Sequence, residues 1–477
     1  MTNMGKYKIS ELFLYRWRYW FGYSVVAIGL IAILVFAGLY APGGISAQEM
    51  QSVVKSSSIN FTDFNSFAIT NLPYHALQQL SITVFGVSIL GIKLPSIILA
   101  FLSAIGMILL LGNWFKPRIA VLASLIAITT GQFIFIAQDG TPAILYLFWP
   151  MLLILLASII SRKPTRFRMF FKIAFCIVAG LSLYTPLSIY VLIALISAII
   201  LHPHLRFLIR QLSKPKIIFA LVIALLLIVP LAISIIKTPS LGLTLLGVPS
   251  QWPDFNANFA ALGAEYLGFV KPGGTTIMTP FFELGSMLIV AIGAYYMIRT
   301  RETAKSYVIG LWILCLIPVV IFNPNFTSIT YLPLVILLAS GLNTLLGHWY
   351  RLFPRNPYAR IGGLIPVVIL VAVLVTSGID RYADGYRYDP RIAPNFSNDL
   401  QLIPKYTETI VVTNNENDFY QVAAKYNKTY SVSTTPAGDS FLATRNAKQS
   451  YSGYRIEKVI TSQKSDQSDR FYLYTKR

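Results

Sequence analysis

Two acidic residues of this chain lie beside stretches that carry almost no charge. Glu49, in "GGISAQEM" (residues 43–50), is the first acid after about thirty nearly uncharged residues, and Asp139 lies in "AQDGTP" (residues 137–142). A carboxylate at the mouth of a partly dry cavity has a raised pKa, which suits a general base that takes a proton from an attacking hydroxyl. A second carboxylate could bind hydroxyl groups or, together with Glu49, a divalent metal ion.

Both acids also have a structural interpretation. Ser46 is a good N-cap, and an acid three residues later favours the positive end of a helix dipole. Asp139 fits an N-cap ahead of Pro142. Gln48 cannot act as a base, although its amide could hold a substrate hydroxyl. The residues alone leave these alternatives open.

The chain that must position these side chains is strongly apolar. It has 477 residues, of which 55% are hydrophobic and 12% charged, and its mean hydropathy is +0.62. This composition excludes an ordinary soluble protein. Apolar runs of about 18 residues or more recur, each long enough to cross a bilayer as a helix. We predict eleven transmembrane spans, the fifth and sixth separated at Pro186. They lie at about residues 20–40, 92–112, 118–136, 142–160, 171–184, 187–201, 216–236, 283–299, 306–323, 327–346 and 361–378.

The charges of the connecting segments predict an orientation. Before residue 379, 21 Lys and Arg residues fall in the N-terminus and the even-numbered gaps between spans, against four on the other side. The positive-inside rule therefore places the N-terminus in the cytoplasm and the C-terminus outside. Most of the net charge of +20 comes from the cytoplasmic segments that set this orientation. We therefore do not interpret it as a nucleic-acid-binding surface and predict no nucleic-acid partner. Six of the eight acids before residue 379 lie on the outer side.

Two long loops and a polar C-terminal region complete the predicted organisation. Residues 1–378 form the transmembrane domain, with outer loops at 41–91 and 237–282, and residues 379–477 form a small extracytoplasmic α/β domain. In the first loop, "EMQSVVKSS" and "PYHALQQLSITVFG" have helical periodicity, which predicts two helices near the membrane interface. In the C-terminal region we predict strands at "ETIVVT", "TYSVST", "YRIEKVIT" and "RFYLYT" and a helix at "DFYQVAAKYN".

Four stretches, in the same order, resemble those of the GT-C membrane glycosyltransferases. The resemblance is closest to family 39 and the aminoarabinose transferases, which use polyprenyl-phosphate sugars. It covers roughly residues 20–350 and rests on "SAQEM" (46–50), the stretch from "NLPYHALQQL" through "GIKLPS" to "GNWF" (71–115), "FIAQDGTPAILYLFW" (135–149) and "FTSITYLPLVILLASGL" (326–342).

The resemblance implies roles for several residues. The first outer loop of the family carries the catalytic base within an Asp-Glu pair, where this chain has Gln48 and Glu49, so the base is expected at Glu49. Lys93 stands at a family Arg position and could pair with the lipid phosphate, although a snorkelling interfacial lysine is the alternative. Tyr331 could donate a hydrogen bond to the same phosphate or belong to an aromatic belt.

The histidines and cysteines give weaker indications. His75 could face the cavity from a helix of the first loop, and a plain interfacial position is the alternative. We discount His202 and His204 as metal ligands, because they lie in a predicted cytoplasmic loop. Both cysteines lie inside apolar spans, with neither disulfide nor metal spacing.

The sequence therefore predicts a polytopic α-helical membrane enzyme of the GT-C type, in the cell membrane. Such an enzyme would transfer a hexosyl or pentosyl unit from a polyprenyl-phosphate donor to a protein, lipid or glycan acceptor on the outer face, with inversion. Two alternatives remain: a transporter or flippase of a lipid-linked substrate, and a catalytically silent relative. The transporter alternative predicts buried charges at mid-membrane and paired broken helices, and we find neither in the sequence.

Overall fold

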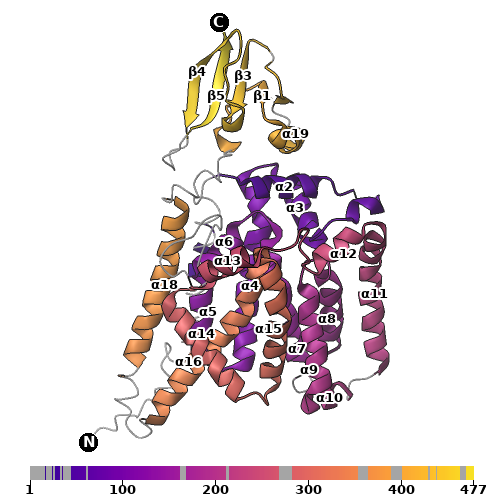
Figure 1. The fold of residues 1–477 in the computed structure, drawn as a ribbon, viewed down its shortest axis with the longest axis vertical. Coiled ribbons are helices and arrows are strands. Elements are labelled where there is room, and N and C mark those ends of the chain that lie inside the picture. The colour runs from indigo at the N-terminus through magenta and orange to yellow at the C-terminus, as the bar shows by residue number, and fades with distance from the viewer. Residues whose placement is uncertain are drawn as a thin grey trace, which may run out of the picture.

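The computed structural model describes most of the chain. The described residues are 44–60, 63–161, 168–210, 214–267, 282–352, 364–387, 400–427, 430–436, 438–461 and 469–477, with residue 362 and single residues or short runs before residue 36. Long helices run side by side, and the small sheet domain stands beyond one end of them (Figure 1).

Helices occupy the ten spans predicted after residue 90, whereas only scattered residues of the first, at 20–40, are described. Within the described residues, five helical segments are long and apolar enough to cross a membrane, or up to eight if each of three bent pairs forms one span. Two further apolar helices, α8 and α14, are shorter. The helices are α4 (Ile89–Trp114), α5 (Pro117–Ile128), α6 (Gly131–Gln138), η3 (Pro142–Ile144), α7 (Leu145–Ile160), α8 (Arg168–Ser182), α9 (Ser188–Leu201), α10 (Pro203–Arg210), α11 (Lys214–Lys237), α14 (Leu284–Arg299), α15 (Ala304–Phe322), η4 (Pro324–Thr330), α16 (Tyr331–Leu352) and α18 (Leu364–Arg387).

The three bent pairs were not expected from the sequence. Between α5 and α6 the axis turns by 65°, between α9 and α10 by 94°, and before α12 (Pro239–Leu245) by 119°. The last two bends precede Pro203 and Pro239. The first has no proline. There, the hydroxyls of Thr129 and Thr130 donate to the carbonyl oxygens of Leu125 and Ala127, which offers the backbone an alternative to helix continuation.

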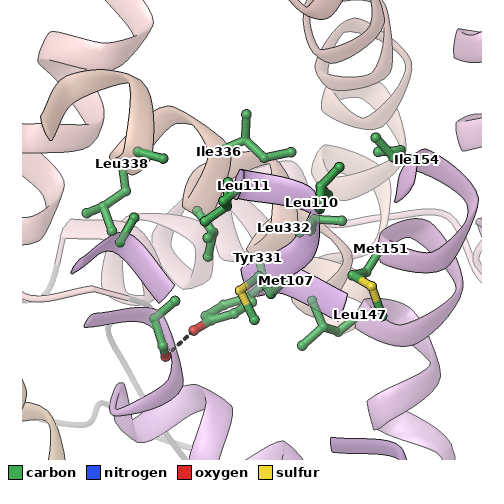
Figure 2. Close-up of a cluster of buried hydrophobic side chains, with 14 of the residues drawn as sticks. Met107, Leu110, Leu111, Leu147, Met151, Ile154, Tyr331, Leu332, Ile336 and Leu338 are labelled. Atoms are coloured by element: carbon green, nitrogen blue, oxygen red, sulfur yellow. Dashed lines mark hydrogen bonds between the residues drawn. The ribbon is translucent and has the colours of Figure 1, made fainter. Parts of the chain in front are cut away.

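Two glycines let α14 and α16 pack against each other. A Cβ added to Gly293 would lie 1.9 Å from the Leu337 carbonyl oxygen, and one added to Gly341 would lie 2.0 Å from that of Ile289. Small residues at such crossings permit backbone contact between membrane helices. Farther along the core, Tyr331 and Leu332 of α16 pack among side chains of α4 and α7 (Figure 2).

The two predicted helices of the first loop are present as α2 (Ala47–Ser57) and α3 (Leu72–Phe85), with a short η2 (Phe64–Phe67) between them. In the second loop, α12 and α13 (Phe255–Leu267) were not predicted.

The C-terminal sheet has the order β2-β1-β3-β5-β4. Strand β1 pairs in parallel with β2 and β3, whereas β5 pairs antiparallel with β3 and β4. Four strands and α19 match the predicted segments, and β3 was missed. The elements are β1 (Thr409–Val411), α19 (Asn414–Asn427), β2 (Ser431–Ser433), β3 (Ser440–Thr444), β4 (Tyr454–Thr461) and β5 (Asp469–Lys476), with short 3-10 turns η6 (Leu400–Leu402) and η7 (Arg445–Ala447).

The sheet domain shares a hydrophobic core with the first loop. Met50 and Val53 of α2 and Ile82 of α3 are buried in one cluster with Phe419 and Tyr420 of α19. A polar contact adds to it: the Asn427 side chain accepts from the Val87 amide at 2.9 Å and donates to its carbonyl oxygen at 3.0 Å. The C-terminal domain therefore fixes the turn between α3 and α4.

Candidate active site

Helix α2 holds Glu49 through a capping box. Ser46 is the N-cap, and its hydroxyl accepts from the Glu49 amide at 3.2 Å. In return Glu49 Oε2 accepts from the Ser46 amide at 2.8 Å. This pairing satisfies two amides that have no partner inside the helix. It also turns the carboxylate inward, and Glu49 is fully buried.

Helix α4 brings Lys93 to the same place. The α4 N-cap is Ser88, whose hydroxyl accepts from the Gly91 amide, and Lys93 follows in the second turn. Lys93 Nζ lies 3.5 Å from Glu49 Oε1 and donates to Gln138 Oε1 at 2.7 Å. With 1% of the Lys93 surface exposed, this is a desolvated ion pair whose partners depend on each other.

The end of α6 closes the cluster. The Gly140 amide donates to Glu49 Oε1 at 2.7 Å. A Cβ at Gly140 would lie 2.6 Å from the Ile92 Cγ2 atom and 3.2 Å from Glu49 Oε1, so a glycine is required for this approach. The neighbouring Asp139 is buried, and its Oδ2 accepts from the Thr141 hydroxyl.

The two carboxylates have different environments. Burial, and secondly the negative charge of Glu49, raise the pKa of Asp139 to about 7. Lys93 and the Thr141 hydroxyl act in the opposite direction, with smaller effect. Asp139 therefore exchanges a proton near neutral pH, which suits a group that accepts a proton from a substrate.

A buried polar network around Gln78 connects the segments that carry Glu49, Lys93 and Asp139. Gln78 of α3 donates to the carbonyl oxygens of Gly140 at 2.8 Å and Ile92 at 3.1 Å, and its Oε1 accepts from Ser52 at 2.8 Å. Gln78 thus links α2, α3, α4 and the end of α6 through one side chain. Such a network fixes geometry when all its members are satisfied.

Comparisons with known proteins find similarity in part of the sequence and in the fold. Residues 73–233, which include Lys93 and Asp139, match the family model described as dolichyl-phosphate-mannose-protein mannosyltransferase. No curated protein sequence matches the chain significantly. ArnT from Cupriavidus metallidurans, in a crystal structure bound to undecaprenyl phosphate, superposes with a TM-score of 0.52 at 11% identity over 95% of this chain and 98% of ArnT.

A second solved structure is that of the oligosaccharyltransferase from Archaeoglobus fulgidus tethered with an acceptor peptide. Its TM-score is also 0.52 at 11% identity, and the match covers 87% of this chain and 64% of that enzyme. The chain thus spans less than two thirds of the archaeal protein. The fold is that of the GT-C membrane glycosyltransferases. At this identity the likeness establishes the fold alone, so residue roles must be argued from the residues of this chain.

Within this GT-C fold, Glu49, Lys93 and Asp139 come together, whereas three other predicted residues lie apart. Gln48 is exposed on the outward face of α2. His75 is buried in the contact of α2 with α3, where its Nδ1 lies 2.8 Å from the Ser56 hydroxyl. Burial, and then the charge of Lys55, lower the pKa of His75 to about 4, so it is neutral at physiological pH.

Tyr331 is placed in the helical core rather than beside the carboxylates. Its hydroxyl donates to the Ala127 carbonyl oxygen at 2.6 Å and lies 2.8 Å from the Thr130 hydroxyl. Its ring stacks on Phe282 with centroids 5.6 Å apart. Tyr331 therefore fixes the bend between α5 and α6, and α6 in turn ends at Gln138 with Asp139 as its C-cap.

Three residues outside the cluster were not singled out from the sequence. Glu265 of α13 is buried, burial raises its pKa to about 7, and it accepts from the Thr327 hydroxyl. Tyr382 of α18 is buried within electrostatic range of both Glu49 and Asp139, and its neighbour Arg381 lies near Glu283. Residues 381 and 382 follow the predicted end of the last span, so they were excluded from the charge count. Glu265 interrupts an apolar helix, which was a readable signal.

The donor set does not fit a divalent metal ion. Among the described residues, no three His, Cys, Asp or Glu side chains come close enough to hold one. Lys93 already neutralises Glu49, and an ammonium group at that distance would repel a cation placed between the carboxylates.

Proposed function

We propose that this protein is a membrane glycosyltransferase that moves a sugar from a polyprenyl-phosphate donor to a hydroxyl acceptor on the outer face of the membrane. The observation that carries the proposal is the buried Glu49–Lys93 pair beside Asp139, within a GT-C fold. The donor class is supported by the matching family model and by the undecaprenyl phosphate named for ArnT. Neither the family model nor the ArnT ligand identifies the sugar that this protein would transfer.

Asp139 is the base in this proposal, in place of the Glu49 expected from the sequence. Both Glu49 oxygens accept hydrogen bonds from backbone amides, and one also faces Lys93, so Glu49 has a structural task. Asp139 Oδ2 accepts from Thr141, and no described residue donates to its Oδ1. An Oδ1 atom that accepts no hydrogen bond from a described residue, together with a pKa of about 7, suits a general base.

The reaction is a direct displacement. The acceptor oxygen attacks the anomeric carbon while Asp139 takes its proton, and the bond from that carbon to the phosphate oxygen breaks. The leaving lipid phosphate keeps the electron pair. Lys93 has three donor hydrogens and two acceptors among the described residues, so its third can stabilise the phosphate. One displacement with one base gives inversion.

The acceptor is proposed only as a class. A protein, lipid or glycan hydroxyl satisfies the same chemistry, and the acceptor peptide named for the archaeal structure favours a protein. The sheet domain packs on α2 and α3 through α19 (Figure 1), and in this proposal it contacts the acceptor.

The proposal is tested by mass spectrometry of envelope glycans and glycoproteins from a deletion strain. We expect one sugar modification to disappear, to return with the wild-type gene, and to stay absent with Asp139→Asn. If no glycan or glycoprotein differs between the deletion and parent strains, the proposed function is wrong. If Asp139→Asn restores the modification, the function stands and the base is misassigned.

A further inference from the structure

Helix α13, in the second loop, carries polar groups on the side that faces the protein. Glu265 is buried and accepts from the Thr327 hydroxyl of η4. Asn258 donates to the Ile321 carbonyl oxygen, near the end of α15, at 2.9 Å. These contacts fix α13 to η4 and α15 through polar groups. A helix that lies between a protein core and water shows the opposite arrangement, with its apolar side chains inward and its polar ones outward.

The outward face of α13 is apolar beyond its first turn. Asn256 is exposed in that turn, and the positions that follow on the same face are Phe259, Ala260, Gly263 and Leu267. Phe259 is 56% exposed and Leu267 is 65% exposed. None of the described atoms lies within 4 Å of a Cβ added to Gly263, so this face is open. Polar groups inward and large apolar side chains outward indicate that hydrocarbon, rather than water, lies against α13.

Helix α12 and the segment after it have the same character. The axis of α12 turns by 119° from that of α11, and α12 lies at the end of the bundle that carries α3 (Figure 1). Leu245 of α12 belongs to a buried cluster against which Leu72 of α3 packs. On the outside, Leu243 is exposed and Trp252 is 84% exposed, and none of residues 238–253 is charged. Exposed tryptophan is typical of the level where lipid headgroups meet acyl chains.

We propose that α12 and α13 lie in the membrane interface, on the same side of the membrane as the first loop, with their exposed apolar side chains against the acyl chains of that leaflet. The partner is the bilayer because this surface continues the exposed apolar face of α11, whose Ile233 and Ile236 immediately precede α12. The surface extends from Leu243 to Leu267, which is more than one lipid chain covers. The second loop is thus a membrane-binding element, and this placement does not depend on the proposed glycosyl transfer.

Spin labelling of the full-length protein in lipid nanodiscs tests this placement. The two native cysteines are replaced by alanine, and one label is attached at Phe259→Cys or Leu243→Cys. The references are Leu226→Cys, at an exposed position in the middle of α11, and Gln421→Cys, on the exposed face of α19. The measured quantity is the ratio of collisions with oxygen, which concentrates in lipid, to collisions with a water-soluble nickel chelate. At both loop positions this ratio should be about fivefold or more above that at Gln421 and below that at Leu226, because interfacial helices lie at the boundary of headgroups and acyl chains.

A second measurement keeps both native cysteines. Phosphatidylcholine brominated near the headgroup end of its acyl chains should quench Trp252, seen as the quenching lost in Trp252→Phe, and lipid brominated near the chain ends should quench it less.

Three results would overturn the proposal. Collision ratios at Phe259 and Leu243 equal to that at Gln421, or absence of Trp252 quenching, would place the segment in water. Protection of both labels from oxygen and from the chelate would show that a protein partner or a second copy covers the surface. Loss of oxygen access at both positions on addition of a polyprenyl phosphate would assign the surface to the chain of that lipid instead of the bilayer.

Discussion

Glu49 and Asp139 are two carboxylates in one buried cluster with separate tasks. Glu49 joins three segments, through the Ser46 amide, the Gly140 amide and Lys93. Asp139 is held by fewer donors and is pushed toward its neutral form by burial and by Glu49. A carboxyl group whose pKa is raised toward the working pH, as that of Asp139 is, suits acid–base work.

The first prediction concerns the base. Asp139→Asn should lower kcat by on the order of 10²–10⁴ with little change in donor KM, because only proton removal is lost. In the wild type, kcat/KM should fall below about pH 7, where Asp139 becomes protonated. Glu49→Gln removes the nearby negative charge, so the pKa of Asp139 should fall and the acidic limb should move to lower pH. Turnover of the donor by the wild type and the two variants, measured across pH 5–9, checks the loss of kcat in Asp139→Asn and the shift of the acidic limb in Glu49→Gln.

The alternative assignment gives the opposite pattern. If Glu49 is the base, Glu49→Gln should abolish turnover at every pH and Asp139→Asn should act mainly on binding. An Asp139→Asn variant that is folded, and that turns over at the wild-type rate, contradicts our assignment.

The second prediction concerns Lys93. Lys93→Ala should raise the KM for a polyprenyl-phosphate donor, and Lys93→Arg should raise it less, because a cation is kept. Lys93→Ala also leaves Glu49 buried without its partner, which costs about 3–5 kcal/mol in typical buried pairs. Lys93→Met/Glu49→Gln should therefore recover thermal stability without recovering donor KM. Recovery of both would show that Lys93 only neutralises Glu49.

Part of this site could be predicted from local sequence. The capping box of Ser46 and Glu49 spans three residues and is readable in "SAQEM". The pairing of Glu49 with Lys93 could not be predicted from the residues alone, since it depends on how α2 packs against α4. The same holds for the contact of Lys93 with Gln138.

At the scale of the helices, the crossing of α14 and α16 leads to a third prediction. Gly341→Ala should destabilise the protein, because the new Cβ meets the Ile289 backbone and the two helices must separate. Gly347→Ala is the matched control on the same helix, since nothing lies within 4 Å of its added Cβ. The thermal midpoint in detergent should fall clearly for Gly341→Ala and stay within a degree or two for Gly347→Ala. Equal midpoints would contradict the close crossing.

The fourth prediction concerns the contact between the sheet domain and the α3–α4 turn. Asn427→Ala removes both hydrogen bonds to Val87, so the Val87 amide should lose protection in hydrogen exchange. Turnover should fall moderately, because the loosened turn leads directly into the first turns of α4, which carry Lys93. Gln421→Ala is a control on the exposed face of α19. Unchanged exchange at Val87 in Asn427→Ala would show that the shared apolar core alone holds the turn.

The sequence predicted those helices that correspond to long apolar runs. It did not predict breaks or strands that such runs do not mark. The apolar runs marked the spans after residue 90, and Pro186 correctly separated α8 from α9. The break at Thr129 and Thr130 was missed because no proline marks it, and threonine hydroxyls bond to carbonyl oxygens of α5 there. Strand β3 was missed because the residues of "SFLAT" do not alternate between apolar and polar; the last four are all buried.

For the whole molecule, the sequence predicted two domains but not how they combine. Alternation and turn residues indicate a sheet in the C-terminal region. The core that α19 shares with α2 and α3 depends on residues more than 300 positions apart along the chain, and no local pattern encodes it. The first loop and the C-terminal domain lie at the same end of the helix bundle (Figure 1). The predicted topology requires this, because it puts both on the same side of the membrane.

The last prediction is the orientation of the whole chain in the membrane. The 21-to-4 bias of cations places α10 and the basic loops in the cytoplasm, and the carboxylate cluster and sheet domain outside. Reporter fusions after residues 165, 210 and 303 should read cytoplasmic, and those after 60, 260 and 420 should read outer. The shared core makes positions 60 and 420 a linked pair, because α2 and α19 pack against each other and cannot lie on opposite sides. If the reporter after residue 420 alone reads cytoplasmic, both the number of spans and the packing of α2 against α19 are contradicted. If the reporters after residues 60 and 420 both read cytoplasmic, the orientation in the membrane is the reverse of the predicted one and the fold is unaffected.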